Sequence, residues 1–563
     1  MKVVIIGGVA GGATCAARIR RLDEQAEIIV FERSGFISYA NCGLPYYIGG
    51  VIEDESDLTL QTPESFGKRF RVKVSVRHEV VAANPENKTV TVKNLESGAV
   101  FDESYDKLLL SPGAKPIIPK FDGIESDRIF TLRTVEDTLK IKKYIDGNHP
   151  ESAVVVGGGF IGIEVAENLR NRGISVTLVE AAEQLMAPFD GDMASFIHAE
   201  VRKHEITLML SRFVEGFADT DSGIDIRLKN SSVIHTDMVV MAIGVAPETA
   251  LAKSAGIKTG VKESIAVNDK METSVRDIYA VGDAVQIKNF VTDADGLISL
   301  AGPANKQGRI AADNICGGNS RYAGGQGSSV IKIFDMTAAA TGINEKTAKS
   351  LGIAADKVIL SPMSHAGYYP GGKLMTMKVL FEKETYRILG AQIVGYEGVD
   401  KRIDVLATAI RAKMKAYELA DLDLAYAPPY SSAKDPVNMA GFIAENIKNG
   451  IVRQWYYEDD KTLPRDGSVT LLDTRTPAEY RTGRVDGFIN IPVDELRERI
   501  GELDKNKPVY VICQSGLRSY IASRILAGNG FDVYNFAGGF RFYDAVRNDK
   551  TLNQKSTPCG MDD

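Results

Sequence analysis

The chain has 563 residues, of which 44% are apolar, and its 67 basic and 74 acidic side chains give a net charge of −7. This length exceeds what one hydrophobic core supports, so we expect three or four domains of roughly 100 to 150 residues each. The charge balance offers no electrostatic footprint for nucleic acid or an anionic membrane. No stretch is apolar enough to span a bilayer, and the first eight residues run into a glycine-rich loop instead of a signal peptide. We therefore expect a cytoplasmic protein.

Residues 2–6 begin a strand, loop and helix pattern typical of dinucleotide binding. An apolar strand leads into the glycine-rich loop 7–12, a helix follows through Arg21, and a second strand, 27–31, ends at Glu32. Such a loop places backbone amides and the positive end of a helix against a pyrophosphate, while the acidic residue binds a ribose hydroxyl. Val9 stands where the middle glycine is usual, so Glu32 is the independent support for this prediction.

The same pattern returns about 150 residues later. A strand at 153–156, the loop 157–162, a helix at 163–171 and a strand at 175–179 end at Glu180. This copy has the regular G-x-G-x-x-G spacing, and two copies predict two dinucleotides. Alanines, not arginines, follow Glu180, and its carboxylate would repel a 2′-phosphate, so the sequence favours NADH over NADPH.

Residues 273–284 form a third landmark, an apolar strand that ends in Gly282 and Asp283. Taken alone, the aspartate could be a helix N-cap. Its position after both glycine loops favours contact with the ribityl hydroxyls of a flavin. Together with residues 109–114, this segment resembles flavoprotein disulfide reductases that bind two dinucleotides. The resemblance implies FAD and NADH as cofactors, and a dimer interface within residues 322–448.

The resemblance also implies a set of cofactor-binding positions in the two glycine loops and the strand ends beside them. These are Gly7, Gly8, Ala10, Gly11, Gly12, Glu32, Arg33, Val80, Ser111, Gly113, Arg133, Gly157, Gly159, Ile161, Gly162, Glu180, Gly244, Gly282 and Asp283.

The five cysteines include no pair at C-x-x-C spacing, and the six histidines form no cluster, so neither disulfides nor a metal site are expected. Cys42 and Cys513 lie in segments typical of reactive thiols, whereas Cys559 lies in a polar tail with no such context. In two-cysteine flavoprotein reductases the first thiol is followed five positions later by a second; here that position is Tyr47. Cys42 must therefore pair with an external sulfur or pass through a sulfenic acid.

The segment 41–47, and the first 450 residues as a whole, resemble coenzyme A disulfide reductases. NADH oxidases and peroxidases, which use the sulfenic acid, typically carry a histidine near the first glycine loop, and residues 7–21 contain none. By this resemblance the candidates for contacting coenzyme A are Thr14, Arg18, Arg21, Ser38, Asn41, Lys306 and Lys434. Arg18 and Arg21, one helical turn apart, can clamp phosphates, although a solvated helix face explains them equally well.

Two tyrosines, Tyr368 and Tyr426, match positions that reach the cysteine of the neighbouring subunit in that family. A phenol there can stabilise or protonate a leaving thiolate. From the sequence alone they are surface or interface aromatics, and Tyr369 competes with Tyr368 for the inward position.

The last part of the chain resembles a rhodanese domain through residues 471–475, 479–480, 483–492, 538–540 and the loop that begins at Cys513. Four residues separate Cys513 from Arg518, whereas cysteine phosphatases use five, so the loop size favours persulfide chemistry. We expect the loop amides and the following helix to lower the pKa of Cys513, with Arg518 adding charge. Asp473 and Arg475 are expected to hold the loop, and Arg475 is also a substrate-binding candidate.

The sequence thus predicts an α/β protein with two Rossmann-like dinucleotide-binding domains, an α+β dimerisation domain and a C-terminal α/β rhodanese domain. The expected boundaries are 1–115 with 252–321 for FAD, 116–251 for NAD(H), 322–448 for dimerisation, 449–464 for a linker, 465–550 for rhodanese and 551–563 for a tail. The predicted function is NADH- and FAD-dependent reduction of coenzyme A disulfide, persulfide or polysulfide by a homodimer. The alternatives are an NADH oxidase or peroxidase, and a redox-sensing protein whose rhodanese unit recruits partners.

Overall fold

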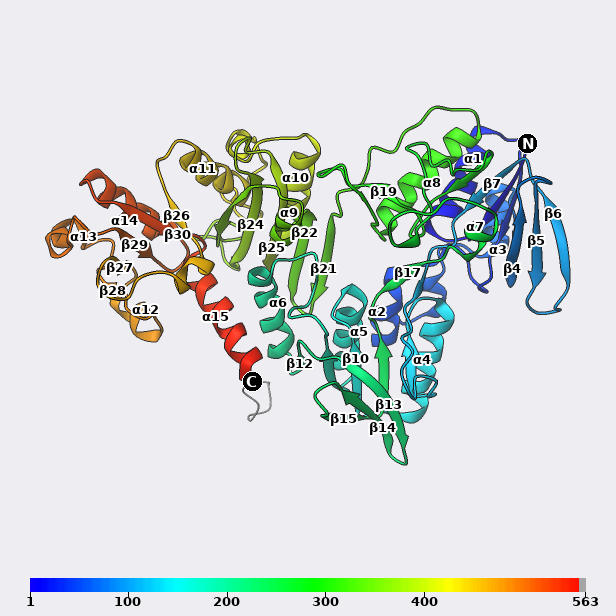
Figure 1. Cartoon of the computed structure of the whole chain (residues 1–563), viewed down its shortest axis with the longest axis horizontal. Coiled ribbons are helices and arrows are strands. Elements are labelled where there is room, and N and C mark those ends of the chain that lie inside the picture. Colours follow the sequence, from blue (N-terminus) through cyan, green and yellow to red (C-terminus); the bar gives the residue numbers. More distant parts are fainter. Residues whose placement is uncertain (556–563) are drawn as a thin grey trace. The chain divides into compact units, whose positions relative to one another are not determined.

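The computed structural model describes residues 1–555, so Cys559 lies outside the described residues (Figure 1). The chain divides into two compact units. The first contains residues 1–183 and 205–327, and the second contains residues 184–204 and the chain from Ser328 onward. The α/β class predicted from the sequence is confirmed. Within the described residues, no helix combines the length and the apolar character needed to cross a membrane.

A parallel sheet with the order β18-β7-β1-β2-β3 forms the centre of the first unit. Its strands are near-continuous apolar runs because both faces are buried: Val3 and Ile5 face helices, whereas Val4 and Ile6 pack with Val80, Val90 and Val92 of an antiparallel sheet. The chain order reverses next to β1, and the carboxyl ends of the strands at such a point form a binding crevice. The strands are β1 (Lys2–Ile6), β2 (Glu27–Phe31), β3 (Lys73–Ser75), β7 (Lys107–Leu110) and β18 (Ile278–Ala280), and the helices α1 (Ala10–Leu22) and α8 (Ala301–Ile315) pack together.

A second parallel sheet, with the order β12-β11-β10-β16-β9, repeats this arrangement. Its elements are β9 (Ile129–Thr131), β10 (Ser152–Val156), β11 (Ser175–Val179), β12 (Thr207–Met209), β16 (Met238–Met241), α4 (Val135–Asn148) and α5 (Phe160–Asn171). Two antiparallel three-stranded sheets accompany the parallel ones: β4 (His78–Asn84), β5 (Thr89–Asn94) and β6 (Val100–Ser104); and β13 (Val214–Thr220), β14 (Gly223–Leu228) and β15 (Val233–Thr236). The smaller elements are α2 (Leu44–Gly49), α3 (Pro63–Phe70), α7 (Ala250–Ser254), β8 (Ala114–Pro116), β17 (Val245–Pro247), β19 (Ile287–Lys288) and β20 (Asp295–Gly296).

The second unit contains an antiparallel sheet with the order β21-β22-β25-β24-β23. Its elements are β21 (Ser329–Ile333), β22 (Met336–Gly342), β23 (Ala355–Leu360), β24 (Met375–Glu382), β25 (Ile388–Gly395), α9 (Glu345–Ser350), α10 (Val399–Arg411) and α11 (Pro436–Lys448). Helix α6 (Gly191–Lys203) lies in the range expected for the NAD(H) domain, yet it belongs to this unit and packs against β21 and β25.

The C-terminal part folds around a parallel sheet with the order β26-β30-β29-β27-β28. Its elements are β26 (Gln454–Trp455), β27 (Thr470–Asp473), β28 (Ile489–Asn490), β29 (Val509–Ile512), β30 (Val533–Phe536), α12 (Pro477–Thr482), α13 (Leu496–Arg499), α14 (Leu517–Gly528) and α15 (Gly539–Lys555). Strand β26 comes from the segment expected to be a linker, because Trp455 is fully buried and pairs with Phe536 of β30.

Candidate functional site

The first glycine loop is so tightly packed that side chains are excluded from it. A Cβ on Gly7, whose φ is +97°, would lie 2.1 Å from the Ser111 carbonyl oxygen, and one on Gly12 would lie 1.9 Å from the Gly7 carbonyl oxygen. Glu32 is buried and accepts hydrogen bonds from the backbone N–H of Gly8 at 2.8 Å and of Ser34 at 2.9 Å. Burial raises the pKa of the Glu32 carboxyl. The loop thus has the close backbone packing that a pyrophosphate requires.

The predicted flavin residues beyond this loop gather where β7 and β18 end. Asp283 forms an ion pair with Arg133 at 2.9 Å, and Arg133 also donates to the Ala114 carbonyl at 3.0 Å. A Cβ on Gly113 would lie 3.3 Å from this guanidinium, and one on Gly11 would lie 2.9 Å from the Ser111 hydroxyl. Because β7, β18 and β1 are neighbours in one sheet, these groups share one edge with the glycine loop.

Four other residues predicted to bind the flavin cofactor lie in environments that differ from one another. The Gly282 N–H donates to Gln307 at 2.7 Å, and Ala10 begins helix α1. Val80 is buried on β4 in the hydrophobic cluster that contains Phe31, while Arg33 is exposed. Val80 therefore contributes packing, and Arg33 offers a charge at the surface.

The second glycine loop has the same packing, with one open position. A Cβ on Gly157 would lie 2.3 Å from the Ala242 carbonyl oxygen, and one on Gly162 would lie 1.9 Å from the Gly157 carbonyl oxygen. Apart from Gly159 itself and its two neighbours in the chain, no described atom lies within 4 Å of the corresponding point at Gly159, so a ligand can approach the backbone there. Glu180 accepts from the N–H of Gly158 at 2.6 Å and of Ala182 at 2.7 Å. Ile161 lies in the first turn of α5, and Gly244, φ +113°, is exposed after β16. This loop therefore also fits a dinucleotide.

Cys42 lies in a short 3-10 turn, Asn41–Gly43, that leads into α2. Its side chain reaches solvent, yet partial desolvation and the nearby Glu164 carboxylate raise the pKa of the thiol. The adjacent Asn41 Oδ1 is buried and has no hydrogen-bond partner among residues 1–555. A buried amide oxygen without a partner costs free energy. The Asn41 Oδ1 therefore suits a ligand that donates a hydrogen bond beside Cys42. Ser38, in the left-handed region at φ 46°, precedes this turn.

Glu164, which the sequence did not single out, faces this region from helix α5. Burial raises the pKa of its carboxyl to about 7. The Tyr46 hydroxyl lies 3.4 Å from Glu164 Oε1, and burial together with this carboxylate raises the pKa of Tyr46 to about 12. Glu164 lies two positions after the second glycine loop, which is visible in the sequence, but its nearness to Cys42 depends on the tertiary structure.

The candidates for contacting coenzyme A divide between the two units. Thr14, Arg18 and Arg21 share one face of α1, and the Thr14 hydroxyl donates to Asn305 of α8 at 2.8 Å, next to the exposed Lys306. Arg18 already forms an ion pair with Asp313 at 2.8 Å, whereas Arg21 is exposed. Lys434 is exposed in the second unit.

The two predicted tyrosines meet each other. The Tyr368 and Tyr426 hydroxyls lie 2.7 Å apart, and both side chains are exposed. This hydrogen bond raises the pKa of Tyr426. Tyr369 instead packs edge to face on His365. Of the two neighbouring tyrosines, Tyr368 is therefore the one that pairs with Tyr426.

Cys513 follows β29 at the carboxyl edge of the last sheet and is completely buried. Its Sγ accepts a hydrogen bond from the Gly516 N–H at 3.2 Å, and Gly516 has a φ of +103° immediately before α14. Arg475 is buried, bonds to both carboxylate oxygens of Asp473, and donates to the Gln514 side chain at 3.3 Å. The aspartate and arginine thus hold this loop, through Gln514.

Arg518 is paired with a carboxylate that the sequence analysis did not assign to it. Its guanidinium donates to both oxygens of Glu479, at 2.6 and 2.8 Å, and these bonds lower the pKa of Glu479 to about 2. The positive charge beside Cys513 is therefore largely compensated at neutral pH.

Asp190, Asp192 and Glu345 also bring their carboxylates together, in the second unit. The buried Lys378 lies among them, 3.0 Å from Asp190 and 2.8 Å from Asp192, and also contacts Glu345. These carboxylates outweigh the effect of burial and raise the pKa of Lys378. An ammonium group thus occupies the centre of the cluster.

Comparison with known proteins agrees with this arrangement. A family model described as pyridine nucleotide-disulphide oxidoreductase matches residues 1–308, the dimerisation domain of that family matches 328–436, and a rhodanese-like domain matches 458–545. The chain belongs to the pyridine nucleotide-disulphide oxidoreductase family and carries a C-terminal rhodanese domain. It is an enzyme, and the family resemblance inferred from its sequence is confirmed.

Within this family the chain is similar to the coenzyme A disulfide reductase of Staphylococcus aureus, with 40% identity over 445 residues, 79% of this chain and all of that protein. The structure of reduced CoADR-RHD from Bacillus anthracis has a TM-score of 0.95 at 50% identity and covers 97% of this chain and 98% of that one. An NAD-dependent persulfide reductase from A. fulgidus has a TM-score of 0.91 at 37% identity, covering 96% and 100%. A water-forming NADH oxidase from Lactobacillus brevis has a TM-score of 0.77 at 30% identity, covering 80% and 100%.

Proposed function

We propose that this enzyme uses NADH to reduce coenzyme A persulfide, or the corresponding disulfide or polysulfide, at Cys42, and that Cys513 supplies the sulfane sulfur. We infer a homodimer in the cytoplasm, with FAD held at the loop 7–12 and NADH at the loop 157–162. FAD, when bound, carries two electrons from NADH to the sulfur at Cys42.

At Cys42, the thiolate attacks the inner sulfur of coenzyme A persulfide, forms a mixed disulfide with coenzyme A and releases HS⁻. Two electrons from NADH, with protons from water, then return this disulfide to Cys42 thiol and coenzyme A thiol. The sum is one persulfide, one NADH and one proton giving one thiol, one sulfide as H₂S and NAD⁺. The buried Asn41 Oδ1 is suited to orient the substrate, and the paired Tyr368 and Tyr426 of a partner subunit are suited to protonate the leaving thiolate.

At Cys513, the thiolate takes the outer sulfur of a donor persulfide and the donor leaves as a thiol. The Cys513 persulfide then passes that sulfur to the coenzyme A thiol, which regenerates Cys513 and forms coenzyme A persulfide. The Gly516 N–H, which already bonds to Sγ, supports a stabilised persulfide anion. Coenzyme A is thus the carrier between the two cysteines.

The observation that supports the proposal is that one chain carries Cys42, with no second cysteine five positions later, and Cys513, whose Sγ accepts a hydrogen bond in a rhodanese-like domain. The test is NADH-dependent sulfide release by Cys513→Ser. We expect this variant to keep its activity with preformed coenzyme A persulfide and to lose at least about tenfold with a donor such as glutathione persulfide plus coenzyme A. Equal rates of the variant and the parent enzyme with every donor would remove the transfer step.

A second candidate, an NADH oxidase working through a Cys42 sulfenic acid, is favoured by the 30% identity to the Lactobacillus brevis enzyme. Comparing NADH consumption by oxygen or peroxide with consumption by coenzyme A persulfide separates the two. Mass spectrometry of the purified enzyme gives an independent answer, because a coenzyme A adduct on Cys42 and an oxidised Cys42 differ in mass.

A further inference from the structure

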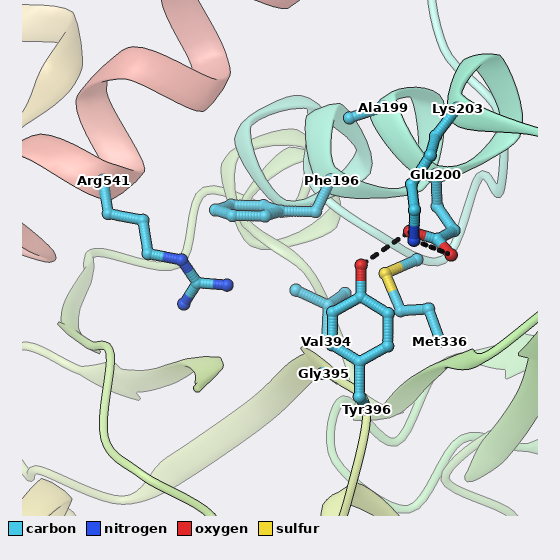
Figure 2. A pocket seen from close by; sticks show the side chains of 9 residues that line it. All are labelled: Phe196, Ala199, Glu200, Lys203, Met336, Val394, Gly395, Tyr396 and Arg541. Carbon is cyan, nitrogen blue, oxygen red and sulfur yellow. Dashed lines mark hydrogen bonds and ion pairs between the residues drawn. The ribbon is translucent and has the colours of Figure 1, made fainter. Parts of the chain in front are cut away.

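A pocket of about 160 Å³ lies in the second unit, between helix α6, strands β22 and β25, and the first turn of α15 (Figure 2). We call it the α15 pocket. Its apolar walls are Phe196, Met336 and Val394. Its polar groups come from Glu200, Lys203, Tyr396 and Arg541. At roughly 30 Å³ for each water molecule, the volume corresponds to about five waters. This is enough space for a small organic molecule.

On one side of the α15 pocket, the charged side chains are paired with one another. Glu200, which is almost fully buried, accepts hydrogen bonds from the Tyr396 hydroxyl at 2.6 Å, from Lys203 at 3.1 Å and from His204 at 3.1 Å. Figure 2 shows Tyr396, Lys203 and Glu200 joined in this way, opposite Arg541. The carboxylate thus has a cation and a phenol as partners, and this side offers no uncompensated charge to a ligand.

Arg541 on the other side lacks such a partner. Its guanidinium donates to the Thr376 hydroxyl at 3.3 Å and lies 5.5 Å from the centre of the Phe196 ring. No carboxylate in residues 1–555 lies within ion-pair distance of it. Burial lowers the pKa of Arg541, which shows that its charge is poorly solvated. A half-buried guanidinium with unused donors favours an anion that accepts from it in parallel.

The same residue is connected to the reactive loop of Cys513 through the backbone. The Arg541 N–H donates to the Gln514 carbonyl at 3.2 Å, and the Phe540 N–H donates to the Cys513 carbonyl at 2.6 Å. Gly539 packs so closely that a Cβ there would lie 2.6 Å from the Ser515 nitrogen. The first turn of α15 therefore contacts the Cys513 loop with its backbone and the α15 pocket with the Arg541 side chain.

We propose that the α15 pocket binds a small organic monoanion, with its carboxylate on Arg541 and its apolar body against Phe196, Met336 and Val394, and that this ligand restrains the Cys513 loop. The charge of Arg541 selects the anion, and the scarcity of other free donors disfavours strongly hydrated inorganic ions. A ligand that fixes Arg541 also fixes the turn that holds the Cys513 and Gln514 carbonyls. Because Cys513 is completely buried, its thiol reacts only when this loop opens, so occupancy of the pocket slows its reactions.

Binding is tested by titration calorimetry of the full-length holoenzyme with benzoate, and with benzamide as the uncharged analogue of the same shape. We expect benzoate to bind with a dissociation constant of about 1 mM and benzamide at least about tenfold more weakly. Arg541→Gln should weaken benzoate binding at least about tenfold. Arg547→Gln, six residues further along α15 and paired with Asp544, should leave it unchanged.

Phe196→Ala, which removes an apolar wall from another helix, should also weaken benzoate, so the site remains testable if Arg541→Gln does not fold. Equal binding of benzoate and benzamide, or of benzoate to the parent enzyme and both pocket variants, overturns the site.

The connection to Cys513 is tested by its alkylation with iodoacetamide, followed by mass spectrometry of the peptide that contains it. We expect saturating benzoate to slow alkylation at least about twofold in the parent enzyme and to have no effect in Arg541→Gln. An unchanged alkylation rate in benzoate-saturated parent enzyme overturns the restraint on the loop. Neither measurement depends on sulfur transfer, so the failure of this inference and the failure of the proposed function are distinguishable.

Discussion

At the scale of single residues, the reactivity of Cys42 depends on a neighbouring carboxylate. The pKa of Glu164 is about 7, so this side chain is mostly neutral below pH 7 and mostly anionic above it. The pKa of Cys42 is raised by desolvation and, further, by the charge of Glu164. A thiolate forms less readily beside an anion, so the ionisation of Glu164 around pH 7 opposes the ionisation of Cys42.

Replacing Glu164 with Gln should therefore increase the rate of Cys42 alkylation above pH 7 and leave it unchanged below. At pH 8 we expect an increase of roughly threefold, as for somewhat less than 1 kcal/mol of Coulomb energy between partly solvated charges. The measurement is the alkylation rate of Cys42 in the holoenzyme from pH 6 to 9, with Glu125→Gln, an exposed site, as the control. Superimposable profiles for Glu164→Gln and the parent enzyme would contradict the coupling.

Glu164→Gln should also alter how the stability of the folded state depends on pH. The folded pKa of Glu164 lies above the ordinary value of 4.5, so the folded state loses stability relative to the unfolded state as pH rises from about 4.5 to 7. Glu164→Gln removes that loss, and its melting temperature should exceed that of the parent enzyme at pH 8 but not at pH 5.

At the scale of elements, the ion pair between Arg518 and Glu479 links the first turn of α14, directly after the Cys513 loop, to helix α12. The Glu479 carboxylate compensates the positive charge of Arg518. A dianionic donor such as thiosulfate needs that positive charge more than a persulfide monoanion does. Glu479→Gln should increase kcat/KM for thiosulfate by about tenfold relative to a persulfide donor. Glutamine keeps an oxygen that can accept the bonds from Thr476, so the start of α12 is preserved.

The measurement is the formation of thiocyanate from thiosulfate and cyanide, with Glu498→Gln on α13 as an exposed control. An equal change for thiosulfate and for the persulfide would show that Glu479 does not set the preference.

Much of the architecture could be predicted because its signals are local. A glycine loop between a strand and a helix, with an acidic residue about twenty positions later, is visible in the sequence for both dinucleotide units. Strand β22 has no such local signal, because Ala338, Ala339 and Ala340 favour helices, yet they are buried in a strand that pairs with β21 and β25. The partners of Arg518 and Cys42, Glu479 and Glu164, lie 39 and 122 positions away, and no local pattern connects them.

At the scale of the whole molecule, the C-terminal helix is held by a buried cluster that joins distant segments. His198 of α6 receives a hydrogen bond from the Leu185 N–H at 3.0 Å on Nε2 and bonds through Nδ1 to Asp549 of α15 at 2.8 Å. Arg202 also bonds to Asp549, at 2.6 Å. These bonds lower the pKa of Asp549 despite its burial. Their contribution to stability is therefore complete well above the ordinary pKa of 3.8 and is lost as pH falls below it.

Asp549→Asn should lower the melting temperature by roughly 5 to 10 °C at pH 7, because it leaves the buried cluster without its anion. Asp544→Asn, on the same helix but on a more exposed pair with Arg547, should lower it by less than about 2 °C. Scanning calorimetry of both variants makes the comparison. A loss of equal size in the two variants would contradict the special role of the buried cluster.

The buried Trp455 of β26 can serve as a fluorescent probe of unfolding. It is the single tryptophan of the chain, and it is fully buried against Phe536, Phe488 and Tyr510 of the rhodanese sheet and its loops. A fragment that began at residue 458 would lack both this side chain and the edge strand that carries it. In the full chain, the emission of one indole therefore reports on the unfolding of the rhodanese core, separately from the flavin signal of the reductase part.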